Sequence, residues 1–240
     1  VSGVAVDGHD NVYVATAGGC AHQVQKFDPN GKFIKGWGGF IGYSYGPSGL
    51  QGIAVGGVSS SSNQDAEENE CAGEEESEEY FVYVADTLNH RIQKFDSKGN
   101  CLLSFGNWGG RFGSGYKPKG GTFAHPYDIA ADKKGNVYVV DHSNNRIQKF
   151  DSSGNFLKSW GNPNKSSSWG SGDLMYPTGV GVDGDGKVWV ADHTNQLVKK
   201  YDSNGKLIET WPKDGTSHNP WFLGRAVSKR SASRHYIQTK

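Results

Sequence analysis

Two histidines stand at matching places in the second half of the chain, each directly after an aspartate. His142 lies in the run VVDHSNN and His193 in the similar run VADHTNQ. Imidazole is a common zinc ligand, but a catalytic zinc site needs three protein ligands. Two matching histidines do not supply them, so we expect no metal site and no cofactor. We place both side chains on exposed turns, as candidates for a binding face.

Aromatic and basic residues are concentrated in two glycine-rich segments, 107–125 and 162–176. Aromatic rings beside cationic groups suit stacking on a nucleobase or gripping an acidic peptide. The alternative is that the same rings pack over the junctions between neighbouring structural units. The candidate binding residues of these segments are Trp108, Arg111, Tyr116, Lys117, Lys119 and Trp169.

The composition is typical of many short strands and turns. Glycine supplies 35 of the 240 residues, roughly twice its average share, and 12% of the residues are aromatic. The three cysteines are odd in number and widely spaced, which argues against a disulfide framework or a CxxC metal site. No apolar run approaches the roughly 18 residues of a membrane-spanning helix. Nothing in the sequence assigns a cellular compartment.

One pattern occurs four times along the chain. Each copy contains a phenylalanine or tyrosine followed by an aspartate and a glycine-containing turn, and periods of this length are typical of repeat architectures. The spacings between the successive aspartates are 68, 55 and 51 residues, the first lengthened by an insert. The expected units span about 1–38, 47–106, 126–161 and 177–211.

Each unit divides into four short apolar runs separated by turn signals, which predicts a four-stranded antiparallel meander. In the third unit the turns KKGN and SSGN separate the runs. The run Val137–Val140 is apolar on both alternating faces, whereas a half-exposed strand alternates apolar and polar residues. Strands covered on both faces need a sheet on each side. Radially arranged four-stranded sheets provide this, so we predict an all-β fold of β-propeller type.

The recurring run V-x-V-A/V-D-x-x-N-x-R-I-Q-K-F-D-x-x-G-x-F/L resembles the NHL repeat, which is named for an Asn-His-Leu signature. Asn89, His90, Arg91 and Ile92 of the second unit match that signature best. The resemblance covers roughly residues 1–211 and implies a propeller of four-stranded antiparallel blades. Propellers of this family usually have six blades, so four recognisable units imply an incomplete arc of a six-bladed ring.

An aspartate and an arginine flank the turn between the second and third strands of two units. The pairs are Asp86 with Arg91 and Asp141 with Arg146, close enough in each unit for a charge-assisted hydrogen bond. Because the pair recurs from unit to unit, we interpret it as structural. The fourth unit departs from the pattern, with Leu197 at the arginine position.

Two segments fall outside the repeat. The acidic insert 58–79 is poor in apolar residues and carries nine acidic side chains with no lysine or arginine, so we expect it to be disordered. The tail 212–240 is basic and has no strand and turn rhythm, so we expect disorder there as well. Once both are set aside, the repeats are only mildly basic, which gives no signal for DNA binding.

The repeats favour a non-catalytic module that binds a protein through the face carrying the long crossovers and the turns between second and third strands. Single-stranded RNA is the alternative partner, and loss of affinity with salt and on removal of Arg111 or Lys117 would identify it. The remaining alternative is a metal-dependent lyase. NHL-like peptidyl-amidoglycolate lyases carry a metal-binding histidine after a proline that precedes a first strand. Here Tyr127 and Thr178 follow the corresponding prolines, so we expect no enzyme activity.

Overall fold

The computed structural model describes residues 1–16, 23–38, 49–59, 79–110, 118–162 and 174–213. These residues form four four-stranded antiparallel sheets, which we call blades one to four in chain order. Within each blade the strands follow one another in sequence order, as in a meander. The predicted insert lies mostly outside the described residues, although its two ends belong to strands. The predicted tail lies outside them beyond residue 213.

The strands of the first two blades are short except where the insert is attached. Blade one contains β1 (Gly3–Val6), β2 (Val12–Thr16), β3 (Gln23–Phe27) and β4 (Phe33–Trp37). Blade two contains β5 (Leu50–Ser59), β6 (Glu79–Asp86), β7 (Arg91–Phe95) and β8 (Cys101–Phe105), with the 3-10 turn η1 (Thr87–Asn89) between β6 and β7.

The last two blades repeat this arrangement almost residue for residue. Blade three contains β9 (Pro126–Ala131), β10 (Val137–Asp141), β11 (Arg146–Phe150) and β12 (Phe156–Gly161), with the 3-10 turn η2 (His142–Asn144) between β10 and β11. Blade four contains β13 (Pro177–Val182), β14 (Val188–Asp192), β15 (Leu197–Tyr201) and β16 (Leu207–Trp211).

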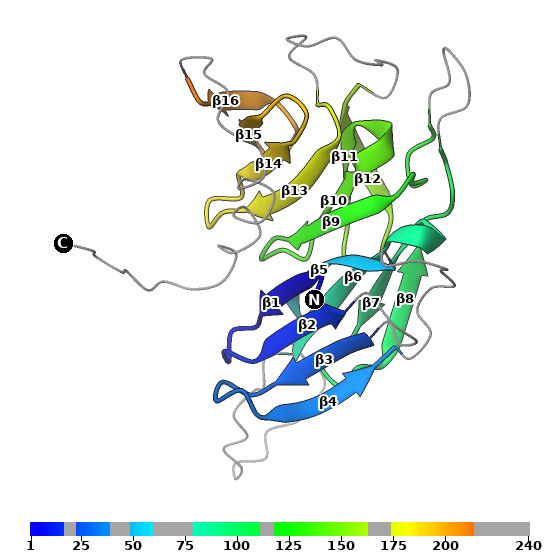
Figure 1. Ribbon diagram of the computed structural model, residues 1–240, viewed down its shortest axis with the longest axis vertical. Coiled ribbons are helices and arrows are strands. Elements are labelled where there is room, and N and C mark those ends of the chain that lie inside the picture. Colours follow the sequence, from blue (N-terminus) through cyan, green and yellow to red (C-terminus); the bar gives the residue numbers. More distant parts are fainter. Residues whose placement is uncertain (17–22, 39–48, 60–78, 111–117, 163–173, 214–240) are drawn as a thin grey trace, which may run out of the picture.

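The blades stand side by side in chain order and form an open arc (Figure 1). Their innermost strands touch in series, because β1 contacts β5, β5 contacts β9 and β9 contacts β13. Over the part of the chain that is described, β13 and β1 make no contact of comparable extent. The predicted all-β fold of four-stranded antiparallel blades is therefore confirmed, and the four blades do not close into a ring.

Aspartates close the turns that separate the first strand from the second and the third from the fourth. In blade three, Asp132 accepts hydrogen bonds from the backbone N–H groups of Lys134 and Asn136 at 2.9 and 2.8 Å. The turn residue Gly135 has a φ of +79°, a conformation that glycine adopts without steric cost. The repeated aspartate and glycine therefore set the length of each turn and the register of the strands that it joins.

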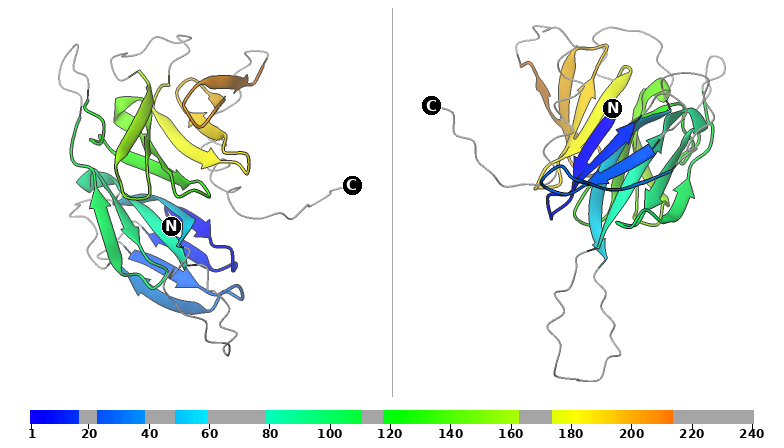
Figure 2. Two further views of the ribbon diagram at one scale, coloured as in Figure 1. Left: turned by 180° about the vertical axis from the view of Figure 1, so that it is seen from behind. Right: turned by 60° about the horizontal axis from the view of Figure 1, so that its bottom comes forward.

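The core lies between the blades, so both faces of the middle strands are buried. On β10, Val137 and Val139 pack with blade two, whereas Tyr138 and Val140 pack with blade four. All four of these side chains are fully buried. The views in Figure 2 show the sheets lying face to face along the arc. The sequence pattern of strands that are apolar on both faces is thus explained by blades covered from both sides.

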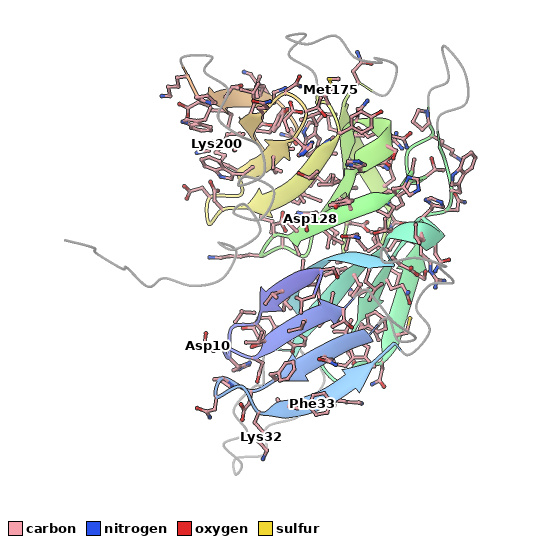
Figure 3. All side chains as sticks on the ribbon, in the orientation of Figure 1. Asp10, Lys32, Phe33, Asp128, Met175 and Lys200 are labelled. Atoms are coloured by element: carbon pink, nitrogen blue, oxygen red, sulfur yellow. The ribbon has the colours of Figure 1, made fainter. Side chains whose placement is uncertain are left out.

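At one position of the innermost strands, three blades have glycine and blade three has an acidic residue. Asp128 on β9 occupies the position that Gly3, Gly52 and Gly179 hold in the other blades. Its carboxylate accepts a hydrogen bond from the backbone N–H of Val180 on β13 at 2.9 Å, across the junction of blades three and four (Figure 3). Burial raises the pKa of Asp128 to about 6.

Candidate binding face

The meander topology sorts the connections onto two faces of the arc. The turns between second and third strands lie on the same face as the long crossovers between blades, and we call this the loop face. Four histidines lie on it, one each from the turns of blades two, three and four and one from the end of a crossover. This histidine row consists of His90, His125, His142 and His193.

The first two histidines of the row link blade two to the start of blade three. Their ring centroids are 4.9 Å apart, and the backbone N–H of His125 donates to Nδ1 of His90 at 3.2 Å. Nδ1 of His125 lies 3.0 Å from Oγ of Ser143, in the turn of blade three. The side chain of His125 is itself exposed. This pair therefore spans the boundary between two blades at the surface of the loop face.

The third histidine lies between two tyrosines. The ring of His142 stacks on Tyr127 at 5.1 Å and lies 5.3 Å from the ring of Tyr176. Nδ1 of His142 lies 2.9 Å from the backbone carbonyl oxygen of Pro177, the first residue of blade four. Because that oxygen is only an acceptor, Nδ1 carries the proton and donates.

The His90 contact and the His142 contact each have an equivalent at the other of these two blade junctions, made there by a different side chain. Oγ1 of Thr87 donates to the carbonyl oxygen of Pro126 at 2.7 Å, as His142 does one blade later. Oδ1 of Asn145 accepts from the backbone N–H of Tyr176 at 2.8 Å, as Nδ1 of His90 does one blade earlier. At each junction, one turn residue donates to the carbonyl oxygen of the proline that begins the next blade, and another accepts from the N–H of the residue before that proline. We call these two contacts together the turn clamp. Each clamp fastens the start of the next blade.

Burial keeps the clamp histidines neutral. Desolvation lowers the pKa of His90, the nearby His125 adds to this effect, and Asp86 opposes it. Desolvation likewise lowers the pKa of His142, where the Pro177 carbonyl opposes the shift and His125 and His193 reinforce it. Neutral His90 is required by its contact, because a protonated Nδ1 cannot accept a hydrogen bond.

The clamp predicts a loss of stability as the pH falls below the ordinary histidine pKa of 6.5. The unfolded chain then binds protons that the folded chain excludes, so the free energy of unfolding decreases. The double variant His90→Asn, His142→Thr carries the side chains that the neighbouring clamps use, and these do not titrate. We expect its melting temperature to fall less steeply than that of the wild type between about pH 7 and 5.

Thermal melts of both proteins over this range measure the difference directly. Asp128, whose pKa is raised to about 6, acts in the opposite sense because its folded form gains a proton as the pH falls. That contribution is common to both proteins and cancels in the comparison. Parallel pH profiles for the wild type and the double variant would contradict the clamp assignment.

The aspartate that ends the second strand of blades two, three and four is the centre of a second network of hydrogen bonds. Asp86 accepts from Nε of Arg91 at 2.8 Å, and the Arg91 side chain is 38% exposed. Asp141 accepts from Nε of Arg146 at 2.7 Å, and here the arginine is only 4% exposed. Both predicted pairs are present, and they differ in how deeply the cation is buried.

Arg146 also holds the crossover that leads into blade three. Its terminal nitrogens donate to the carbonyl oxygens of Pro118, Lys119 and Thr122 at 2.9, 3.1 and 2.8 Å. Asp141 in turn accepts from the backbone N–H of Ala124 at 2.7 Å. The pair therefore positions the crossover as well as closing its own turn.

Blade four also pairs its buried aspartate with a cation, but with a different residue. Leu197 occupies the arginine position, and Nζ of Lys199 lies 2.7 Å from Oδ2 of Asp192. Lys199 is 1% exposed and stands where Gln148 donates to Asp141 in blade three. Sequence reasoning missed this lysine. The signal available was a lysine at a position that the three other blades fill with glutamine, namely Gln25, Gln93 and Gln148.

The other predicted binding residues fall into two groups. Trp108 is 47% exposed and its ring lies 6.4 Å from that of His90, so it extends the histidine row. Lys119 is exposed in the same crossover. Sequence reasoning did not select Tyr176, although, like His125 at the end of the preceding crossover, it comes directly before the proline that begins a blade. The candidates outside the described residues are Arg111, Tyr116, Lys117 and Trp169.

The described residues contain neither a metal-binding cluster nor a membrane-spanning helix. In this part of the chain, no three histidine, cysteine, aspartate or glutamate side chains gather in a group that could hold a metal ion. Nδ1 of His90 and Nδ1 of His142 are both engaged in clamp contacts. No helix among the described residues has the length and apolar character needed to cross a membrane.

Solved structures share the fold. Virginiamycin B lyase from Staphylococcus aureus aligns with a TM-score of 0.54 and 15% identity, over 90% of this chain and 57% of that chain. A streptogramin B lyase aligns with the same TM-score and identity and with 56% of its own chain covered. At such low identity the likeness concerns the fold alone.

Sequence comparison identifies the repeats. The family model described as NHL repeat matches residues 123–150 and 174–201. The mouse NHL repeat-containing protein 3 is 26% identical over 226 residues, which cover 90% of this chain and 56% of the relative. The Drosophila melanogaster protein brain tumor is 30% identical over 129 residues, which cover 53% of this chain and 11% of the relative. The chain thus spans about half the length of the first relative and far less of the second. Together with the four blades, these matches identify NHL repeats in this chain within a fold of β-propeller blades.

Proposed function

We propose that this protein is a non-catalytic interaction module that binds a protein partner through the loop face. The observation that carries the proposal is the histidine row with its exposed aromatic neighbours. Trp108 and Tyr176 are 47% and 45% exposed, although both lie on a face built from buried cross-blade contacts. Large aromatic side chains are enriched among the residues that dominate binding energy at protein interfaces.

The backbone beneath these side chains is held by contacts between blades. The N–H of Tyr176 donates to Asn145 of the preceding turn, and Trp108 forms a β-bridge with buried Phe123. Side chains on a backbone fixed in this way lose less conformational entropy on binding. The loop face therefore supports recognition by aromatic anchors that are largely positioned before the partner arrives.

The charge of the described part of the loop face favours a protein over a nucleic acid. The pKa values of His90 and His142 are both lowered, so these side chains are neutral at pH 7. Lys119 is the exposed cation of the described crossover. Binding of single-stranded RNA would require a positively charged groove along the backbone of the strand. The described part of the loop face offers aromatic and imidazole surface with little positive charge.

The test is affinity capture with the wild type and with the double variant Trp108→Ala, Tyr176→Ala. Proteins retained by the wild type are identified by quantitative mass spectrometry, and each is then purified for measurement of its affinity. We expect the double variant to weaken binding by at least about thirtyfold, the effect of losing roughly 2 kcal/mol at an interface hot spot. Ile208→Ala, at a 49% exposed position on the outer strand of blade four, serves as the control.

Two outcomes would overturn the proposal. One is a partner whose affinity is unchanged in the double variant and reduced in the control, which would place binding on the outer rim of the blades. The other is retention of RNA in place of protein, with an affinity that falls steeply as salt is raised.

A further inference from the structure

Two histidines of the loop face have their ring nitrogens assigned by the turn clamp, and in opposite ways. We propose that Nε2 of His90 and Nε2 of His142 act as a donor and an acceptor that bind the backbone of an extended, uncharged peptide segment. This inference rests on the function proposed above and names the part of the partner that the loop face contacts. Both histidines lie at junctions inside the arc, where blade three meets blades two and four.

The backbone of the next blade fixes the tautomer of His90. The N–H of His125 donates to Nδ1 of His90 at 3.2 Å. A backbone N–H can only donate, so Nδ1 carries no proton, and a neutral imidazole then carries its proton on Nε2. Desolvation lowers the pKa of this ring and so keeps it neutral at pH 7. Nε2 of His90 is therefore a hydrogen-bond donor.

The tautomer of His142 is the reverse. Nδ1 of His142 lies 2.9 Å from the carbonyl oxygen of Pro177, which can only accept, so Nδ1 carries the proton. Desolvation lowers the pKa of this ring as well. Nε2 of His142 therefore has a lone pair and is a hydrogen-bond acceptor.

Both Nε2 atoms are available to a ligand. Within the described part of the chain, neither of them makes a hydrogen bond to another residue. Some side-chain atoms are both buried and unbonded, such as Oδ1 of Asn144, but neither Nε2 belongs to that group. Each Nε2 is therefore in contact with solvent, and the water bound there can be exchanged for an amide group of a ligand.

The two rings are close enough for one short segment to reach both, because His125 links them. The ring centroid of His125 is 4.9 Å from that of His90, and its Nδ1 lies 3.0 Å from Oγ of Ser143, the residue after His142. An extended chain advances about 3.3 Å per residue. A few residues in extended conformation therefore span the two histidines.

Aromatic rings stand at both ends of this pair. Trp108 is 47% exposed and its ring lies 6.4 Å from that of His90. Tyr176 is 45% exposed and its ring lies 5.3 Å from that of His142. Rings in these places suit apolar side chains on either side of the backbone that the histidines bind. The ligand is thus an extended segment with an apolar residue near each end of the contact.

The peptide group is the chemistry that fits both nitrogens. Its C=O accepts from Nε2–H of His90, and its N–H donates to Nε2 of His142. A carboxylate would suit His90 but would face the lone pair of His142, and an ammonium group would be mismatched in the opposite sense. A polar group that loses its water without gaining a partner weakens binding, so the pair selects against both kinds of charge.

Two substitutions remove the Nε2 atoms and keep the clamp. His90→Asn supplies the acceptor that Asn145 uses at the following junction, and asparagine tolerates the φ of +54° found there. His142→Thr supplies the donor that Thr87 uses at the preceding junction. His9→Thr is the matched control, because His9 is exposed on the turn between β1 and β2, on the face opposite the loop face. Thermal melts at pH 7 establish that all three variants are folded.

The probe is a library of short random peptides displayed on phage and selected on the wild type at pH 7. Selected peptides are synthesised and their affinities measured by calorimetry. We expect uncharged sequences with apolar residues at two separated positions. His90→Asn and His142→Thr should each weaken binding about fivefold, as loss of a hydrogen bond worth about 1 kcal/mol implies. His9→Thr should bind as the wild type does.

Methylation of single peptide nitrogens identifies the amide that His142 accepts from. One N-methylated peptide should bind the wild type more weakly, yet bind His142→Thr as well as its unmodified parent does. A peptide whose methylation at every position affects both proteins equally would overturn the backbone contact. Enrichment of acidic or basic peptides, or a library that yields no peptide bound by the wild type, would overturn it as well.

The double variant Trp108→Ala, Tyr176→Ala separates this inference from the proposed function. If it binds the selected peptides as the wild type does, the function proposed for the loop face is wrong. If it loses them whereas His90→Asn and His142→Thr keep full affinity, the aromatic anchors stand and the backbone contact is overturned.

Nitrogen-15 spectra of the histidine rings test the tautomers without any peptide. We expect the proton on Nε2 in His90 and on Nδ1 in His142 at pH 7. The same tautomer in both rings would overturn the proposal, because the pair would then offer two donors or two acceptors.

Discussion

Replacing Arg146 with alanine is expected to lower the free energy of unfolding by about 3 to 5 kcal/mol, the cost of leaving one partner of a buried ion pair unpaired. Asp141 would remain buried without the cation that lies 2.7 Å from it. The carbonyl oxygens of Pro118, Lys119 and Thr122 would each lose the donor that Arg146 supplies. The crossover into blade three would then be held more weakly, by bonds such as those of Gln148 to Thr122 and Gly121.

The same substitution one blade earlier is the internal control. Arg91 forms the equivalent contact with Asp86, but its side chain is 38% exposed. We expect Arg91→Ala to cost only about 1 kcal/mol, since solvent already screens the partly exposed arginine and the buried Asp86 keeps Asn89 and Gln93 as donors. Urea denaturation of both variants gives the two values. Equal losses would contradict the account, because they would mean that burial and the crossover contacts of Arg146 add nothing.

Replacing Lys199 with alanine is expected to cost a similar amount, about 3 to 5 kcal/mol. Lys199 is 1% exposed, and its Nζ lies 2.7 Å from the buried carboxylate of Asp192. Removing the ammonium group would leave that carboxylate with Asn195 and the backbone N–H of Met175 as its remaining partners. Neutral donors of this kind offset only part of the cost of a buried charge.

The two arrangements seen in blades three and four suggest a rescue. The double variant Leu197→Arg, Lys199→Gln gives blade four the arginine and glutamine that surround Asp141 in blade three. We expect the double variant to recover most of the stability that Lys199→Gln alone loses. Denaturation of the wild type, both single variants and the double variant measures the coupling between the two positions. A coupling energy near zero would show that the two positions act independently.

The sequence was sufficient to predict the blades because their signals are local. The turn aspartates and glycines, such as Asp132 and Gly135, lie within a few residues of the strands that they join. The run Val137–Val140 indicated burial on both faces, and the structure places blades two and four against it. Each of these features depends on neighbours in the chain, which a repeated sequence displays directly.

Contacts between blades were harder to predict because they join residues that are far apart in sequence. His142 was selected as a surface residue, yet its Nδ1 binds the carbonyl oxygen of Pro177, 35 positions away. Within blade four, the pairing of Asp192 with Lys199 was missed for a different reason, because the lysine replaces an arginine that two other blades carry two positions earlier, where this blade has Leu197. Such substitutions can be recognised in sequence by comparing the repeats position by position.

The binding role of the loop face remains a prediction at every position. The structure brings Trp108 close to His90 and His142 close to Tyr127 and Tyr176. These neighbours were not predicted, because the residues of each pair lie in different strands, turns or crossovers and are separated in sequence. Their proximity follows from the order of the strands and blades, which the sequence predicted.

The central claim is that cross-blade clamps join blades two, three and four in chain order into one platform, since the histidine row rests on them. Amide hydrogen exchange at Tyr176 tests this claim most directly. Its N–H donates to Oδ1 of Asn145 in the preceding blade at 2.8 Å. Asn145→Gly removes that acceptor and still allows the φ of +53° found there.

Exchange at Tyr176 should be slow in the wild type and several times faster in Asn145→Gly, as loss of a hydrogen bond worth about 1 kcal/mol implies. Exchange at Gly99, whose N–H donates to the carbonyl oxygen of Asp96 in a turn of blade two, should not change. Fast exchange at Tyr176 in the wild type, or equal rates in the two proteins, would contradict the clamp and the platform built on it.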